Sequence, residues 1–98
     1  MTQKIIIRPE AEKDINSAYD WYEEQQSGLG VEFAQALSDS MDLILEFPKM
    51  YSELYRGIRR ALLKKFPYGI YYLVQDETDI VVAVHRLAMD PEKWKSRT

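Results

Sequence analysis

Apolar residues in the first half of the chain recur at the spacing of two amphipathic helices. A β-branched run at 4–8 precedes them and predicts an opening strand. Pro9 suits the first turn of a helix, and apolar side chains at intervals of three and four predict a helix over 10–26. After a glycine-containing break, a second apolar stripe predicts a helix over 31–47, which Pro48 ends. Two helices joined in this way form a hairpin.

The second half of the chain alternates short apolar runs with turn residues, which is the pattern of strands. The predicted strands cover 58–66, 70–75 and 79–86, after a loop at 49–57. The breaks between them are short enough for hairpin turns, so the strands should form an antiparallel meander. The element order β-α-α-β-β-β predicts an α+β fold. In it, a helical hairpin packs on one face of a small, largely antiparallel four-stranded sheet, as one domain over 1–98.

Side chains of a strand point alternately to the two faces of a sheet, so parity predicts which strand residues face the helices. We expect the bulkier apolar set to lie under the helices: Ile58, Leu62, Phe66, Ile70, Tyr72, Val74, Ile80, Val82 and Val84. The helices should contribute Trp21, Tyr22, Phe33 and Leu37 to this core. The opposite, open face should carry Arg59, Lys65, Tyr71 and His85. Three further basic side chains should emerge at the sheet edges, namely Arg60, Lys64 and Arg86.

The composition excludes several kinds of active site. No cysteine is present, which rules out disulfides, thiolate metal sites and thiol catalysis. The single histidine gives no cluster at metal-ligand spacing, and the sequence shows neither a glycine-rich phosphate loop nor a strand-turn-helix serine nucleophile. We therefore expect no metal and no cofactor. The sequence shows no signal peptide and no apolar run near the roughly 20 residues that cross a membrane, so we expect a cytoplasmic protein without a membrane partner.

The net charge of −3 hides an uneven division along the chain. Residues 1–55 hold 4 Lys/Arg and 11 Asp/Glu, a net of −7, whereas residues 56–98 hold 9 and 5, a net of +4. Five of the ten residues at 56–65 are basic, and a basic tail at 93–97 is expected to form about one helical turn. Two interpretations remain open. Either the basic residues form a face that binds a polyanion or an acidic partner, or the helices merely carry solvated acids.

Several local sequences, taken in order, resemble the RelE/ParE toxin superfamily. The first is the opening strand followed by Pro-Glu-Ala-Glu-Lys-Asp-Ile at 9–15, and the second is Phe-Pro at 47–48. The run Ile-Arg-Arg-Ala-Leu-Leu-Lys-Lys-Phe-Pro-Tyr-Gly-Ile-Tyr-Tyr at 58–72 looks like the second and third strands of the family. The closing segment of the family is resembled by His85-Arg86, Asp90-Pro91 and Trp94.

The resemblance implies the toxin half of a bacterial type II toxin–antitoxin pair, of the plasmid-stabilising kind, with a cognate antitoxin protein as partner. RelE-like members cut messenger RNA in the ribosome with a concentrated basic face, whereas ParE-like members poison DNA gyrase and need no hydrolytic site. The pI of about 5.1 disfavours work against ribosomal RNA, and the turn at 66–68 and the ending at 90–94 look ParE-like. The ParE-like branch is therefore favoured. A ribosome-dependent mRNA endonuclease and a non-toxic binding module on the same fold are the alternatives.

The resemblance also sets the candidate site residues. If the chain is RelE-like, cleavage needs a proton-transfer group and cationic support, for which His85 and Arg86 are the candidates. Met89 stands where the family usually has an arginine, so a role for that arginine is not carried over. A structural hydrogen bond is the alternative role for His85. The residues expected to bind the antitoxin or the target are Arg59, Arg60, Lys64, Lys65, Tyr71, Trp94 and Arg97.

Overall fold

The computed structural model describes residues 3–98, so the first two residues of the expected domain, Met1 and Thr2, lie outside the described part. Helices and strands follow the predicted order with one additional short strand, and a short closing helix stands where one helical turn was expected in the basic tail. In chain order they are β1 (Lys4–Ile7), α1 (Pro9–Gln25), α2 (Leu29–Glu46), β2 (Glu53–Tyr55), β3 (Ile58–Leu62), β4 (Tyr68–Gln75), β5 (Thr78–Arg86) and α3 (Glu92–Lys95).

The described strands form one mixed sheet in the order β1-β5-β4-β3-β2. Neighbouring strands run antiparallel except for β1, which lies parallel to β5 with Ile7 beside Val81. The predicted α+β class and the largely antiparallel sheet are confirmed, but the prediction of four strands was one short. The extra strand, β2, forms inside the predicted loop and pairs Glu53 with Arg59. Three residues are too few to show the alternation by which a strand is recognised in a sequence.

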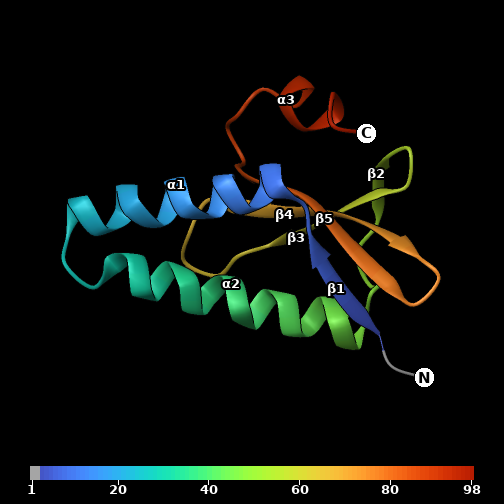
Figure 1. The fold of residues 1–98 in the computed structure, drawn as a ribbon, viewed down its shortest axis with the longest axis horizontal. Helices are drawn as coiled ribbons and strands as arrows, with labels where there is room; N and C mark the ends of the chain where they lie inside the picture. The colour runs from blue at the N-terminus through green and yellow to red at the C-terminus, as the bar shows by residue number, and fades with distance from the viewer. Residues whose placement is uncertain (1–2) are drawn as a thin grey trace.

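The two long helices run side by side as the predicted hairpin, as Figure 1 shows. The chain reverses at Gly28, whose φ of +90° is a left-handed conformation that glycine adopts without steric cost. The carboxylate of Glu23 accepts hydrogen bonds from the backbone N–H of Gly28 at 2.9 Å and of Gly30 at 2.9 Å. A side chain of α1 thus satisfies orphan donors at the start of α2, which fixes the angle between the helices.

The core between the hairpin and the sheet contains most of the residues predicted for it. Phe33 is fully buried and Leu37 is 6% exposed, and Tyr22 stacks on Phe33 with ring centroids 5.4 Å apart. The hydroxyl of Tyr72 donates to the carbonyl of Pro48 at 2.7 Å, which ties β4 to the segment after α2. Trp21 was wrongly predicted as a core residue, because 52% of its surface is exposed.

The face assignment of β3 was wrong. Ala61 and Leu63 lie in the core under the helices, whereas Ile58 packs on the opposite face and Leu62 is 50% exposed. The hydroxyl of Ser40 on α2 donates to the carbonyl of Leu62 at 3.1 Å, so the helix approaches this strand closely. Side-chain bulk was therefore a misleading guide, because the close approach favours a small residue under the helix.

The face assignment of β5 was wrong at Ile80 and Val82, which both pack on the face away from the helical hairpin. The register shifts between Tyr71, which pairs with Ala83, and Tyr72, which pairs with Val81, so one extra residue of β5 bulges out of the ladder. Val82 and Ala83 consequently both pack on the face away from the helical hairpin, while Val84 returns to the core under the helices as predicted. A bulge reverses the parity of every residue beyond it, and nothing in the sequence marks its position.

The second face of the sheet is not open, because the C-terminal segment covers it. Trp94 is 5% exposed and stacks on Tyr71, with ring centroids 4.7 Å apart and an interplanar angle of 23°. Tyr71 and His85, both expected on an open face, are 2% and 3% exposed. Figure 1 shows α3 on the opposite side of the molecule from α2. The sheet is therefore packed on both faces, by α1 and α2 on one and by α3 on the other.

Candidate functional site

The outer edge of β5 lacks a strand partner beyond the end of β1, and two side chains take the place of that strand. β1 ends at Ile7, while β5 continues to Arg86. Asp14, on α1, accepts a hydrogen bond from the N–H of Val84 at 3.1 Å. Arg97 donates to the carbonyl of Val82 at 3.0 Å. Because unpaired backbone groups at a buried edge are costly, these two contacts allow β5 to extend past its neighbour.

Asp14 and Arg97 also form an ion pair with two hydrogen bonds. Nη1 of Arg97 lies 2.6 Å from Oδ2 of Asp14 and Nη2 lies 3.2 Å from Oδ1. The side chains are 16% and 22% exposed, so water screens the pair only in part. Burial raises the pKa of Asp14, but hydrogen bonds from His85, Arg97 and Val84 outweigh burial and hold this pKa below its usual value. Asp14 is therefore an anion in the folded protein at neutral pH.

His85, the single histidine of the chain, belongs to this same network. Its Nε2 lies 3.2 Å from Oδ2 of Asp14, and its Nδ1 is buried without a hydrogen-bond partner among residues 3–98. One ring nitrogen thus faces a carboxylate and the other is inaccessible to water. The network joins α1, β5 and the C-terminal tail across 83 residues of sequence. The geometry gives His85 a structural hydrogen bond, the alternative role considered for it.

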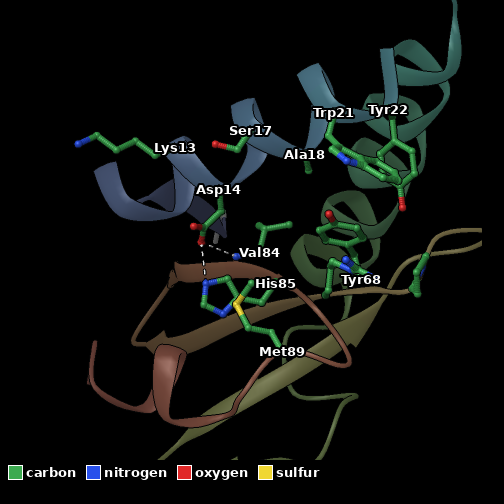
Figure 2. A pocket seen from close by; sticks show the side chains of 12 residues that line it. Lys13, Asp14, Ser17, Ala18, Trp21, Tyr22, Tyr68, Val84, His85 and Met89 are labelled. Carbon is green, nitrogen blue, oxygen red and sulfur yellow. Dashed lines mark hydrogen bonds and ion pairs between the residues drawn. The ribbon is translucent and has the colours of Figure 1, made fainter. Parts of the chain in front are cut away.

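The other candidate for catalysis, Arg86, follows His85 at the end of β5 and has no ion-pair partner among residues 3–98. It is exposed and lines a groove of about 470 Å³ between α1 and the ends of β4 and β5. Figure 2 shows the groove with Asp14, Val84 and His85 at one side and Trp21, Tyr22 and Tyr68 at the other. Tyr22 and Tyr68 line this groove together with Arg86; burial raises the pKa values of both phenols, and the positive charge of Arg86 acts in the opposite direction.

The expected binding residues of β3 do not form one basic face. Arg59 was wrongly placed on the open face: it pairs with Tyr72 on the helix side, and its guanidinium donates to the carbonyls of Tyr51 and Lys49 and lies 3.5 Å from Glu53. Arg59 therefore holds the segment between α2 and β2 against the sheet.

Arg60 lies instead on the face that α3 covers, opposite Tyr71 in the ladder. Its aliphatic part passes over Gly69, where a Cβ atom would meet Cγ and Cδ of Arg60 at 2.9 Å. Glycine at this position therefore leaves room for the aliphatic stem of Arg60 to cross the strand. The charged side chain of Arg60 is half-buried as a result.

Lys64 and Lys65 are exposed after the end of β3, where Lys65 has a φ of +71°. Both line a second groove, of about 360 Å³, between α2 and the end of β3. Its apolar lining includes Leu43 and Leu62, which are 38% and 50% exposed. The structure therefore brings two of the seven expected binding residues together at an open surface, while Tyr71, Trp94 and Arg97 make contacts within the fold.

Asp14 is the member of this network that the sequence did not predict. The available signal was its spacing, because it lies three residues after Ala11 and four before Ala18, both buried on the inner stripe of α1. An acid within an apolar stripe indicates a paired carboxylate rather than a solvated one. Among residues 3–98 no group of His, Asp and Glu is arranged to hold a metal ion, and no helix is long and apolar enough to cross a membrane.

The comparisons with known proteins agree with this fold. The family model of the ParE toxin of the type II toxin–antitoxin system parDE matches residues 5–91. No curated protein sequence matches the chain. Among solved structures, the chain is similar to the chromosomal ParDE toxin–antitoxin system from P. aeruginosa, with a TM-score of 0.74 at 16% identity over 88% of this chain and 96% of that one. This likeness supports the fold, and the family model covers most of the sequence. The chain therefore belongs to the ParE toxin family of type II toxin–antitoxin systems.

Proposed function

We propose that this ParE-family toxin acts on DNA gyrase in the cytoplasm, and that a cognate antitoxin protein neutralises it. Such a pair would stabilise the plasmid or other genetic element that carries it. The observation that favours gyrase over messenger RNA is the environment of His85. RNA cleavage on the sheet face needs an accessible proton-transfer group beside the scissile phosphate. In this chain both nitrogens of the imidazole are withdrawn from solvent, one against Asp14 and one in the protein interior.

The covered sheet face supports the same proposal. A messenger would have to reach Tyr71, yet that ring lies under Trp94 at 4.7 Å and is 2% exposed. Two of the cations expected to bind a target also make contacts within the fold, since Arg59 binds carbonyls of the neighbouring loop and Arg97 pairs with Asp14. A gyrase poison needs a contact surface and no hydrolytic centre, which fits a chain whose buried polar groups serve its own fold.

The experiment is induction of the toxin in growing bacteria, followed in parallel by message integrity and by DNA-damage signalling. We expect a DNA-damage response, an intact message pool, and accumulation of cleaved DNA when purified toxin is added to gyrase and supercoiled plasmid. His85→Gln keeps a hydrogen-bonding side chain, so toxicity should survive in this variant if it folds, as judged by its thermal unfolding. Codon-positioned message cleavage that His85→Gln abolishes would show a RelE-like nuclease. Harmless expression of folded protein would show a non-toxic binding module.

The groove beside α2 is the surface that we assign to the antitoxin. It combines exposed leucines with Lys64 and Lys65 on one side and Glu32 and Asp39 on the other, which suits a segment that carries apolar side chains and charges of both signs. Lys64→Glu with Lys65→Glu should weaken antitoxin binding by calorimetry at low salt. Lys93→Glu makes the same charge change as Lys64→Glu alone, but on the exposed part of α3, and should leave binding unaltered. Equal effects of both changes would indicate general charge attraction instead of a defined surface.

A further inference from the structure

The groove between α1 and the β4–β5 pair has the lining of a ligand site. Trp21 forms part of one wall with half of its surface exposed, and its indole lies edge-on to Tyr22 with ring centroids 5.0 Å apart. Ala18, Tyr68 and Val84 are buried residues that line the same hollow. An exposed indole is unusual in a chain that buries its other tryptophan at 5% exposure, and it offers a flat apolar surface to a planar ring.

Two cations stand at the same groove without a carboxylate partner. Neither Lys13 nor Arg86 takes part in an ion pair among residues 3–98, and both side chains are exposed. The one acid in the lining, Asp14, is already matched by Arg97 at 2.6 Å, so the groove keeps a surplus of positive charge. Tyr22 and Tyr68, whose ring centroids lie 5.9 Å apart, line the same groove as Arg86, so phenol groups accompany the guanidinium there. Guanidinium and hydroxyl groups together favour a phosphate.

The size of the groove limits its occupant. A volume of about 470 Å³ lies within the range of small-molecule sites, which is roughly 300–1,000 Å³. We propose that this groove binds a small planar aromatic phosphate, of the chemical class of a nucleoside monophosphate, with the ring against Trp21 and the phosphate against Arg86 and Lys13. The site is separate from the antitoxin groove beside α2 and does not depend on the gyrase proposal. Stacking and a charge-assisted contact of this kind give a Kd of about 0.01–1 mM.

The test uses the two tryptophans as reporters. In a proton–nitrogen correlation spectrum of the full chain, AMP should shift the indole N–H resonance of Trp21 and leave that of buried Trp94 in place. Adenosine and inorganic phosphate should each bind at least about 10-fold more weakly than AMP, because each lacks one half of the recognised chemistry. If inorganic phosphate binds as tightly as AMP, or if adenosine does, the combined recognition is wrong. If a single-stranded oligonucleotide binds the same resonances more tightly than AMP, the groove is a nucleic-acid surface instead.

Two variants and a matched control locate the contacts. Arg86→Gln should weaken AMP binding by about 10-fold or more, the usual effect of a charge-assisted hydrogen bond to phosphate. Trp21→Ala should weaken it by about 5-fold or more, which is read from backbone resonances of the groove. Arg56→Gln makes the same substitution at an exposed arginine in the β2–β3 turn and should not alter Kd. The absence of any shift with AMP, or equal weakening by Arg86→Gln and Arg56→Gln, would overturn the proposal.

Discussion

Removal of Asp14 is the most informative perturbation of this fold, because one carboxylate holds three elements together. Asp14→Ala leaves the N–H of Val84 without its acceptor and Arg97 without its counter-ion. A buried donor left unpaired costs about 1–3 kcal/mol. Breaking a fully buried ion pair costs about 3–5 kcal/mol and an exposed pair contributes about 0–1 kcal/mol. The exposed fractions of 16% and 22% place this pair between those limits.

These terms overlap, because Asp14 makes both contacts, and we expect Asp14→Ala to lower the free energy of unfolding by about 2–4 kcal/mol. For a domain of this size the midpoint of thermal unfolding should fall by roughly 10–25 °C. The assay is urea unfolding of Asp14→Ala, Arg97→Ala and the double variant. The coupling between the two side chains should be about 1–2 kcal/mol. Asp20→Ala, an exposed aspartate of the same helix, serves as the matched control and should change stability by less than about 0.5 kcal/mol.

The pH dependence supplies an independent check on Asp14. Its pKa is lowered in the folded state, so its contribution to stability is fully present above the unfolded pKa of about 3.9. That contribution is lost as pH falls through the folded pKa. The difference between wild type and Asp14→Ala should therefore be constant from pH 7 to 5 and shrink below about pH 4. Two results would refute the conclusion that this ion pair joins α1 to the tail. One is that the effects of Asp14→Ala and Arg97→Ala on the free energy of unfolding are additive, and the other is that Asp14→Ala lowers it by less than about 1 kcal/mol at pH 7.

Three further perturbations probe the rest of the packing. Leu37→Ala should cost about 2–5 kcal/mol by denaturant unfolding, because Leu37 is 6% exposed, whereas Trp21→Ala should cost under about 1 kcal/mol at 52% exposure. Asp79 is fully buried with one oxygen lacking a partner among residues 3–98, and burial raises its pKa. Stability should therefore fall as pH rises through that pKa, and Asp79→Asn should be more stable than wild type by about 1 kcal/mol at pH 7 but not at pH 4. Trp94→Ala should release the C-terminal segment from Tyr71, seen as faster proteolysis after residue 86; unchanged proteolysis would mean that the stack contributes little.

Local signals in the sequence were sufficient for the helices and for the order of the elements. Pro9, the glycine-containing break and Pro48 delimit α1 and α2 within two residues, because backbone chemistry acts at the position where it is encoded. The meander was predictable for the same reason, since its turns are short. The strand β2 was not predictable, because it has three residues and is too short to show a periodic pattern, and it is defined by its pairing with β3 at Arg59.

The faces of the sheet and the site depended on contacts that the sequence does not encode locally. The bulge at Val82 lies where β5 extends beyond the end of β1. There the backbone of β5 makes hydrogen bonds with a side chain of α1 and a side chain of the C-terminal tail. Asp14 and Arg97 are 83 residues apart, so no window of sequence contains both. His85 was predicted as the proton-transfer group of a RelE-like enzyme, but it is 3% exposed and faces Asp14, which no local pattern in the sequence indicates. Contacts between distant parts of the chain therefore decided the roles of the residues that had been predicted as functional.

The cover over the second sheet face has a consequence for where function can lie. The surface under α3 is taken up by Trp94 against Tyr71, and Arg97 of the same C-terminal segment is paired with Asp14. Accessible features that combine charge with apolar area are the groove beside α1 and the groove beside α2. If the chain acts by contact, substitutions that abolish toxicity without lowering stability should cluster at Arg86 or at Lys64, and those at Tyr71 should lose both together. A screen that scores toxicity and thermal unfolding for each variant decides this. If variants at Tyr71 are stable but harmless, the surface that contacts the target lies under α3. The C-terminal segment would then have to move away before the toxin could act.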